Sequence, residues 1–101
     1  MADFVGTDRL GHAVTLADAA WYGHIITTHP EMTSLRSEVE AACTDADTVR
    51  QSSSDPDCVI HFKRSVSRPS LLVKVVVNTQ DGFVRTAHLA KRVTGGVQLW
   101  P

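Results

Sequence analysis

Histidine is the residue in this 101-residue chain best suited to acid–base chemistry, and the chain contains five of them. Two, His24 and His29, lie in the segment WYGHIITTHP over residues 21–30, and a third, His88, lies near the end of a strand-like segment. Histidine works as acid and base near neutral pH because its ordinary pKa is close to 6.5. His24 and His29 are five residues apart, about 140° around an α-helix, so they do not form the i, i+4 pair of a metal site. We therefore expect neither a metal nor another cofactor.

Three further side chains could complete a site for cleaving RNA. Arg64 shares the apolar face of a predicted strand with Ile60 and Phe62, where a cation needs an anion to offset its burial. Thr86 and His88 share one face of a later strand, two residues apart. Metal-independent RNA cleavage needs a base for the 2′-hydroxyl proton, an acid for the leaving 5′-oxygen, and donors or cations on the phosphate. The predicted catalytic residues are His24, His29, Arg64, Thr86 and His88.

The two helical histidines each have a second interpretation. If His24 lies on the apolar helix face with Trp21 and Ile25, that setting fixes its ring and keeps it neutral, as a proton-transfer residue requires. The same position suits a core histidine that is hydrogen-bonded to the backbone. His29 fits a second acid/base or a phosphate contact, and it equally fits a helix cap.

The net charge of −1 hides two halves of opposite charge. Residues 1–57 hold three basic and ten acidic residues, a net charge of −7, and residues 58–101 hold seven basic residues and one acidic residue, a net charge of +6. This split is typical of a chain in which one layer meets a polyanion, although it can also arise by chance in a short sequence. We expect RNA as the partner, and the predicted RNA contacts are Lys63, Lys74 and Arg85.

Periodicity predicts that two helices precede a sheet. A short hairpin over residues 1–16 turns at Gly11, which can take positive φ. Helices are expected over residues 17–28 and 30–43, separated at Pro30 because the residue before a proline is pushed out of the α region. The buried stripe of the second helix is Met32, Leu35, Val39 and Ala42.

The second half of the sequence has strand periodicity. Residues 48–53 read as a polar edge strand, 58–66 as an alternating strand, 71–78 as a central strand apolar on both faces, and 83–90 as a last strand after the Asp-Gly turn. Residues 91–101 read as a tail. The short connections predict antiparallel neighbours. The fold class is therefore α+β: one domain over residues 1–101, with two consecutive helices packed on a four- to five-stranded antiparallel sheet.

The segments WYGHI (21–25) and HPEM (29–32) resemble the helical signature of small phage and bacterial nucleases of the Barnase–EndoU–colicin–RelE-like (BECR) superfamily. The likeness continues from about residue 8 to residue 100, through Pro56, Lys63-Arg64, residues 75–77 and 84–88, Gly95-Gly96 and Leu99-Trp100. It implies a metal-independent endoribonuclease of the toxin or effector type, with a cognate inhibitor protein and with His24, His29, Arg64 and Thr86 as functional residues. Similar proteins often carry an aromatic residue, typically Tyr, where this chain has His88.

Composition and motifs exclude several other classes. Hydrophobic residues make up 43% and charged residues 21% of the chain, which is typical of a globular domain and not of a disordered one. P-loop, dinucleotide-binding and α/β-hydrolase motifs are missing. With no signal peptide and no apolar stretch long enough to span a bilayer, we expect a cytoplasmic protein without a membrane partner, in which Cys43 and Cys58 are free thiols. The alternative function is a non-catalytic nucleic-acid-binding or protein-interaction module with a basic sheet.

Overall fold

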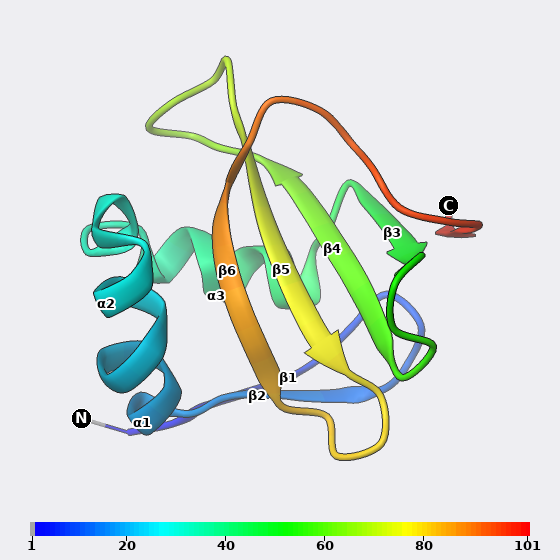
Figure 1. Cartoon of the computed structure of the whole chain (residues 1–101), viewed down its shortest axis with the longest axis horizontal. Helices are drawn as coiled ribbons and strands as arrows, with labels where there is room; N and C mark the ends of the chain where they lie inside the picture. The colour runs from blue at the N-terminus through cyan, green and yellow to red at the C-terminus, as the bar shows by residue number, and fades with distance from the viewer. Residues whose placement is uncertain (1) are drawn as a thin grey trace.

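The computed structural model describes residues 2–101 as an α+β fold built on one five-stranded antiparallel sheet (Figure 1). The strands are β3 (Thr48–Gln51), β4 (Cys58–Arg64), β5 (Leu72–Asn78), β6 (Val84–Ala90) and β7 (Gln98–Trp100), in the spatial order β6-β5-β4-β3-β7. A separate hairpin of β1 (Phe4–Thr7) and β2 (Ala13–Leu16) turns at Gly11, whose φ is +84°. The α+β class, the antiparallel sheet and the hairpin are confirmed, whereas the strand at the centre of the sheet is β4, and β5 lies between it and the edge strand β6.

The prediction of two consecutive helices over residues 17–43 is wrong. One main helical segment covers residues 18–28 as α1 (Asp18–Ala20), a π-helical turn η1 (Trp21–Ile25) and α2 (Ile26–Thr28). It ends before Pro30, as expected, because His29 leaves the α region with φ −126° and ψ 78°. A 3-10 turn, η2 (Pro30–Met32), follows, and the second helix, α3, covers only Arg36–Thr44.

Thr33 explains why the second helix does not begin at Pro30. Its backbone N–H donates to the Pro30 carbonyl at 3.2 Å, and its hydroxyl donates to the same carbonyl at 2.7 Å. In an α-helix the backbone N–H of Ser34 would occupy that acceptor, so the threonine side chain competes with helix formation at this point. Met32, in the 3-10 turn, and Leu35, at the N-cap of α3, are nevertheless buried in the main core.

The predicted strand pattern also needs two corrections at the edges of the sheet. β3 was expected to be an edge strand, but β7 pairs along its outer side, with Val49 opposite Trp100 and Arg50 opposite Gln98. The expected tail over residues 91–101 therefore contributes a strand. This last part of the chain is attached through the Arg9 guanidinium, which lies 4.3 Å from the centroid of the Trp100 ring.

The two faces of the sheet differ in what covers them. α3 and the β1-β2 hairpin pack on one face around the main core, which includes Trp21, Ile25 and Cys43. Figure 1 shows α3 behind the sheet and the helical segment 18–28 beside its edge at β6. The other face, which we call the open face, carries a smaller apolar cluster of Ile60, Phe62 and Leu72, partly covered by Val93. Both cysteines are free, as expected, and both are buried.

No helix within residues 2–101 is both long and apolar enough to cross a membrane.

Candidate functional site

A bulge in β6 decides which of its side chains reach the open face. Val77 pairs with Val84, but its neighbour Val76 pairs with Thr86, so Arg85 is an extra residue in β6. Thr86 and His88 share the open face, as the sequence predicted. Val84 does not join them, because the bulge turns it toward the main core, where it is buried.

His88 lies at the centre of a small cationic group on the open face. Lys74 of β5 is the cross-strand partner of His88 on one side and of Phe62 of β4 on the other. The Lys74 Nζ lies 6.0 Å from the centroid of the Phe62 ring. The His88 ring is partly buried, and its Nδ1 is buried without a hydrogen-bond partner. Burial lowers the pKa of His88 below its ordinary value, and the charges of Lys74 and His29 lower it further, against an opposing effect of Glu31. A neutral His88 can accept a proton.

His29 comes to this group from the end of the helical segment. Its ring and that of His88 lie with centroids 4.9 Å apart and planes inclined by 31°. The Glu31 carboxylate lies 3.8 Å from Nδ1 of His29, so it forms an ion pair with the ring when the ring carries a proton. Glu31 is not among the residues predicted from the sequence, and its only sequence signal was an acidic residue two positions after His29, in the first turn after Pro30.

His24 does not have the apolar setting that the sequence predicted. Trp21 and Ile25 are buried, but His24 between them is exposed. The hydroxyl of Thr28 lies 3.5 Å from its Nδ1. The π-helical turn at residues 21–25 widens the helix at this point, so positions expected from a 3.6-residue period are shifted. Burial therefore does not fix the orientation of the His24 ring.

Arg64 is also placed differently from the expectation. It lies on β4, two strands away from β6, opposite Leu72, and it is exposed rather than buried. Its Nη1 donates to the carbonyl of Pro69 at 3.2 Å. The structure therefore brings together His29, His88, Lys74 and Thr86, and leaves His24 and Arg64 outside this group.

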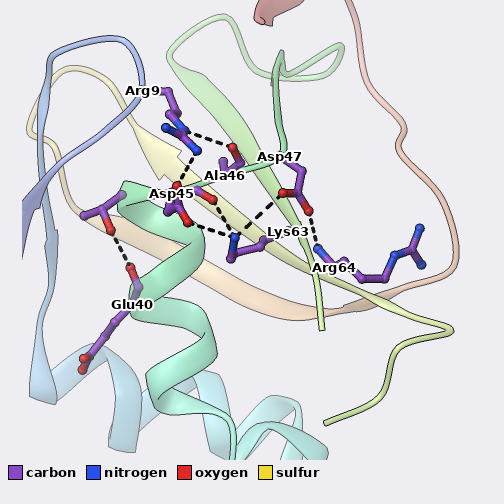
Figure 2. Close-up of polar contacts among 8 residues, drawn as sticks. Arg9, Glu40, Asp45, Ala46, Asp47, Lys63 and Arg64 are labelled. Atoms are coloured by element: carbon purple, nitrogen blue, oxygen red, sulfur yellow. Dashed lines mark hydrogen bonds and ion pairs between the residues drawn. The ribbon is translucent and has the colours of Figure 1, made fainter. Parts of the chain in front are cut away.

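Two of the predicted RNA contacts have carboxylate partners. Lys63 Nζ lies 3.2 Å from Asp45 and 3.8 Å from Asp47, and Arg85 Nη2 lies 2.7 Å from Asp81. Figure 2 shows Lys63 between the two aspartates, while the side chain of Arg64 extends away from them. Asp45 also pairs with Arg9, and these cations lower its pKa. Among the three predicted RNA contacts, Lys74 is the one without an ion pair in residues 2–101.

A second titratable pair lies buried on the other face of the sheet. His61 of β4 is fully buried, and its Nε2 is 3.8 Å from the carboxylate of Asp8, which accepts the backbone N–H groups of Leu10 and His12. Neither ring nitrogen of His61 has a hydrogen bond within residues 2–101. The hairpin over residues 1–16 was predicted, but no pattern along the chain indicated that it would pack over His61 of β4.

The His29–His88 group lies on a surface and not in a cavity. Residues 2–101 enclose no pocket, and within the same range no three His, Cys, Asp or Glu residues are placed to hold a metal ion.

Comparison with known proteins gives no match to this chain: no protein-family model, no curated protein and no solved structure. The likeness to BECR nucleases therefore stays a prediction.

Proposed function

We propose that the protein is a metal-independent endoribonuclease whose acid–base pair is His29 and His88. The observation that supports this proposal is the 4.9 Å separation of the two rings beside Lys74, the cross-strand partner of His88. Two imidazoles and an ammonium on one exposed face supply the groups that general acid–base cleavage of a phosphodiester needs.

Each side chain has a defined role in this proposal. His88, with its lowered pKa, takes the proton of the RNA 2′-hydroxyl. The 2′-oxygen attacks the phosphorus, the bond from phosphorus to the 5′-oxygen breaks, and protonated His29 gives its proton to that oxygen. The products are a 2′,3′-cyclic phosphate and a free 5′-hydroxyl. Lys74 and the Thr86 hydroxyl stabilise the charge on the non-bridging oxygens.

The experiment is cleavage of a labelled single-stranded RNA by the purified chain in excess EDTA. His29→Gln and His88→Gln should each lower the rate by roughly 10²–10⁴-fold, the usual size of general acid–base catalysis. His12→Ala, a change to an exposed histidine in the β1-β2 hairpin, is the matched control and should cleave normally. His24→Ala tests the sequence prediction directly: if it abolishes cleavage while His88→Gln does not, the proposed pair is wrong.

A non-catalytic RNA-binding module is the second candidate, and the open position of the histidine pair favours it. Residues on an exposed strand face can bind a nucleic acid whether or not they cut it. If the wild-type chain binds RNA but leaves it intact both in EDTA and in Mg²⁺, this second function replaces the first.

A further inference from the structure

The ten lysines and arginines fall into two groups according to their ion pairs. Four have carboxylate partners: Arg9, Arg36, Lys63 and Arg85. The other six have no ion-pair partner anywhere in residues 2–101: Arg50, Arg64, Arg68, Lys74, Lys91 and Arg92. Pairing neutralises a cation locally, so the six unpaired side chains contribute most of the positive potential around the protein.

Four of these six side chains lie together at one end of three adjacent strands, β4, β5 and β6. The register pairs Arg64 with Leu72 and Leu72 with Ala90, so the end of β4, the start of β5 and the end of β6 lie in one row. Arg68 lies in the loop that joins β4 to β5, and Lys91 and Arg92 follow β6 directly. All four are exposed. We call Arg64, Arg68, Lys91 and Arg92 the basic end; it is the upper end of β4, β5 and β6 in Figure 1.

The carboxylates near the basic end already have partners other than its four side chains. Asp45 and Asp47 hold Lys63, and Asp47 also accepts the backbone N–H of Arg64. Glu38 of α3 accepts four hydrogen bonds from residues 65–67. These acids do not pair with the side chains of the basic end, which stay free to bind an anion.

The opposite end of the same three strands is acidic. The loops over residues 52–57 and 79–83 carry Asp55, Asp57 and Asp81, all exposed, and the cation next to them, Arg85, is paired with Asp81. The sheet therefore has a charge gradient along its strands. A polyanion that reaches the open face is attracted to one end and repelled from the other.

We propose that the basic end binds the phosphate backbone of single-stranded RNA that continues from the His29–His88 pair. The inference rests on the proposed function for the identity of the polyanion. On the open face, the row Ala90–Leu72–Arg64 comes directly after the row that holds His88 and Lys74. An RNA strand positioned at the histidines and Lys74 therefore reaches the basic end directly. Attack by the 2′-oxygen requires a sugar that can rotate into line with the breaking bond, which a duplex restrains, so the RNA is single-stranded here.

The test compares two double variants that remove equal charge. Both are made in a His88→Gln background, so that the RNA is not cut, and binding of a fluorescent oligouridine is measured by anisotropy at several salt concentrations. Arg68→Gln with Lys91→Gln removes two unpaired cations. It should weaken binding roughly tenfold and reduce the slope of log affinity against log salt by about 1.4, because each contact with a single strand contributes about 0.7. Lys63→Gln with Arg85→Gln removes two paired cations and should leave that slope unchanged.

The outcomes separate this inference from the proposed function. If the wild-type chain does not cut RNA but the two double variants differ as described, the nuclease proposal fails and the RNA surface stands. If the chain cuts RNA but both double variants lose the same slope, the basic end is not the binding surface. If polyglutamate competes with the oligouridine on equal terms per charge, the surface fits an acidic protein instead, and the RNA assignment is overturned.

Discussion

His29 and His88 lie with their ring centroids 4.9 Å apart although 59 positions separate them in the chain. His29 ends the helical segment beside the sheet, and His88 comes from the edge strand β6. After burial and Lys74, the charge of His29 is a further cause that lowers the pKa of His88, because a proton on the His29 ring disfavours a second proton nearby.

Replacing Lys74 should change the titration of His88. Lys74 disfavours the charged form of His88, so Lys74→Met should raise the His88 pKa toward its ordinary value. The measurement is an NMR titration of the histidine ring signals. Lys63→Met, which removes a cation on β4 that is paired with Asp45 and Asp47, is the control and should leave His88 unchanged. An identical His88 titration in wild type and Lys74→Met would show that the two side chains do not interact.

Acid should destabilise the fold through His61. Burial lowers the pKa of His61, against a smaller opposing effect of Asp8, so the unfolded chain takes up a proton near pH 6.5 while the folded chain stays neutral. The free energy of unfolding therefore has its full value above this pH. It falls as the pH drops below it, by at most about 1.4 kcal/mol per pH unit for one proton. His88, whose pKa is also lowered, contributes with the same sign.

Urea unfolding at several pH values between 7.5 and 5 measures this effect. His61→Leu keeps much of the side-chain volume but cannot take up a proton, so its stability should depend less on pH than that of wild type. His88→Gln separates the contribution of the second histidine. A His61→Leu variant with an unaltered pH dependence would show that His61 is not the responsible group.

Removing the charge of Glu38 should loosen the loop between β4 and β5. Its carboxylate accepts the Ser65 hydroxyl at 2.7 Å, the Val66 N–H at 2.9 Å, the Ser67 N–H at 3.3 Å and the Ser67 hydroxyl. Burial raises the pKa of Glu38, but these hydrogen bonds outweigh it and hold the pKa below its ordinary value. Glu38→Gln should lower the free energy of unfolding by about 1–2 kcal/mol at pH 7.

The pH dependence provides the control for this variant. Because the folded-state pKa is lowered, the contribution of Glu38 is present above the ordinary value of 4.5 and is lost as the pH falls through the lower, folded-state value. The difference between wild type and Glu38→Gln should thus shrink at acidic pH. An equal difference at pH 7 and pH 3 would show that the loss comes from the amide group itself rather than from the missing charge.

The two cysteines should resist alkylation in the native protein. Burial, with the nearby charges of Glu40 and Asp8, raises the pKa of Cys43 to about 12, and burial and Asp55 raise the pKa of Cys58. A thiol reacts as its thiolate, so both should react slowly with iodoacetamide at pH 8 and rapidly once guanidinium unfolds the chain. Mass spectrometry of the products counts the modified thiols, and rapid labelling of Cys43 in native protein would contradict its burial.

The sequence by itself determined the features that depend on neighbouring residues. Alternation of apolar residues predicted β4 and β6, and a run that is apolar on both faces predicted β5. The Asp-Gly pair predicted the turn before β6, and Pro30 predicted the end of the first helical segment. It also placed Thr86 and His88 on one face. These features follow from local backbone geometry and the two-residue period of a strand, which act within a few residues.

Only the tertiary structure decided which side chains meet. The bulge at Arg85, the pairing of β7 with β3 and the exposure of His24 and Arg64 depend on how distant segments pack. The contact between His29 and His88 depends on where the helical segment lies beside β6. Within residues 2–101, the side chains of the basic end have no ion pairs because the nearby carboxylates contact other groups. A pattern read along the chain reports the period of each element, but ion pairs and ring contacts are set by distances in space between residues far apart in the sequence.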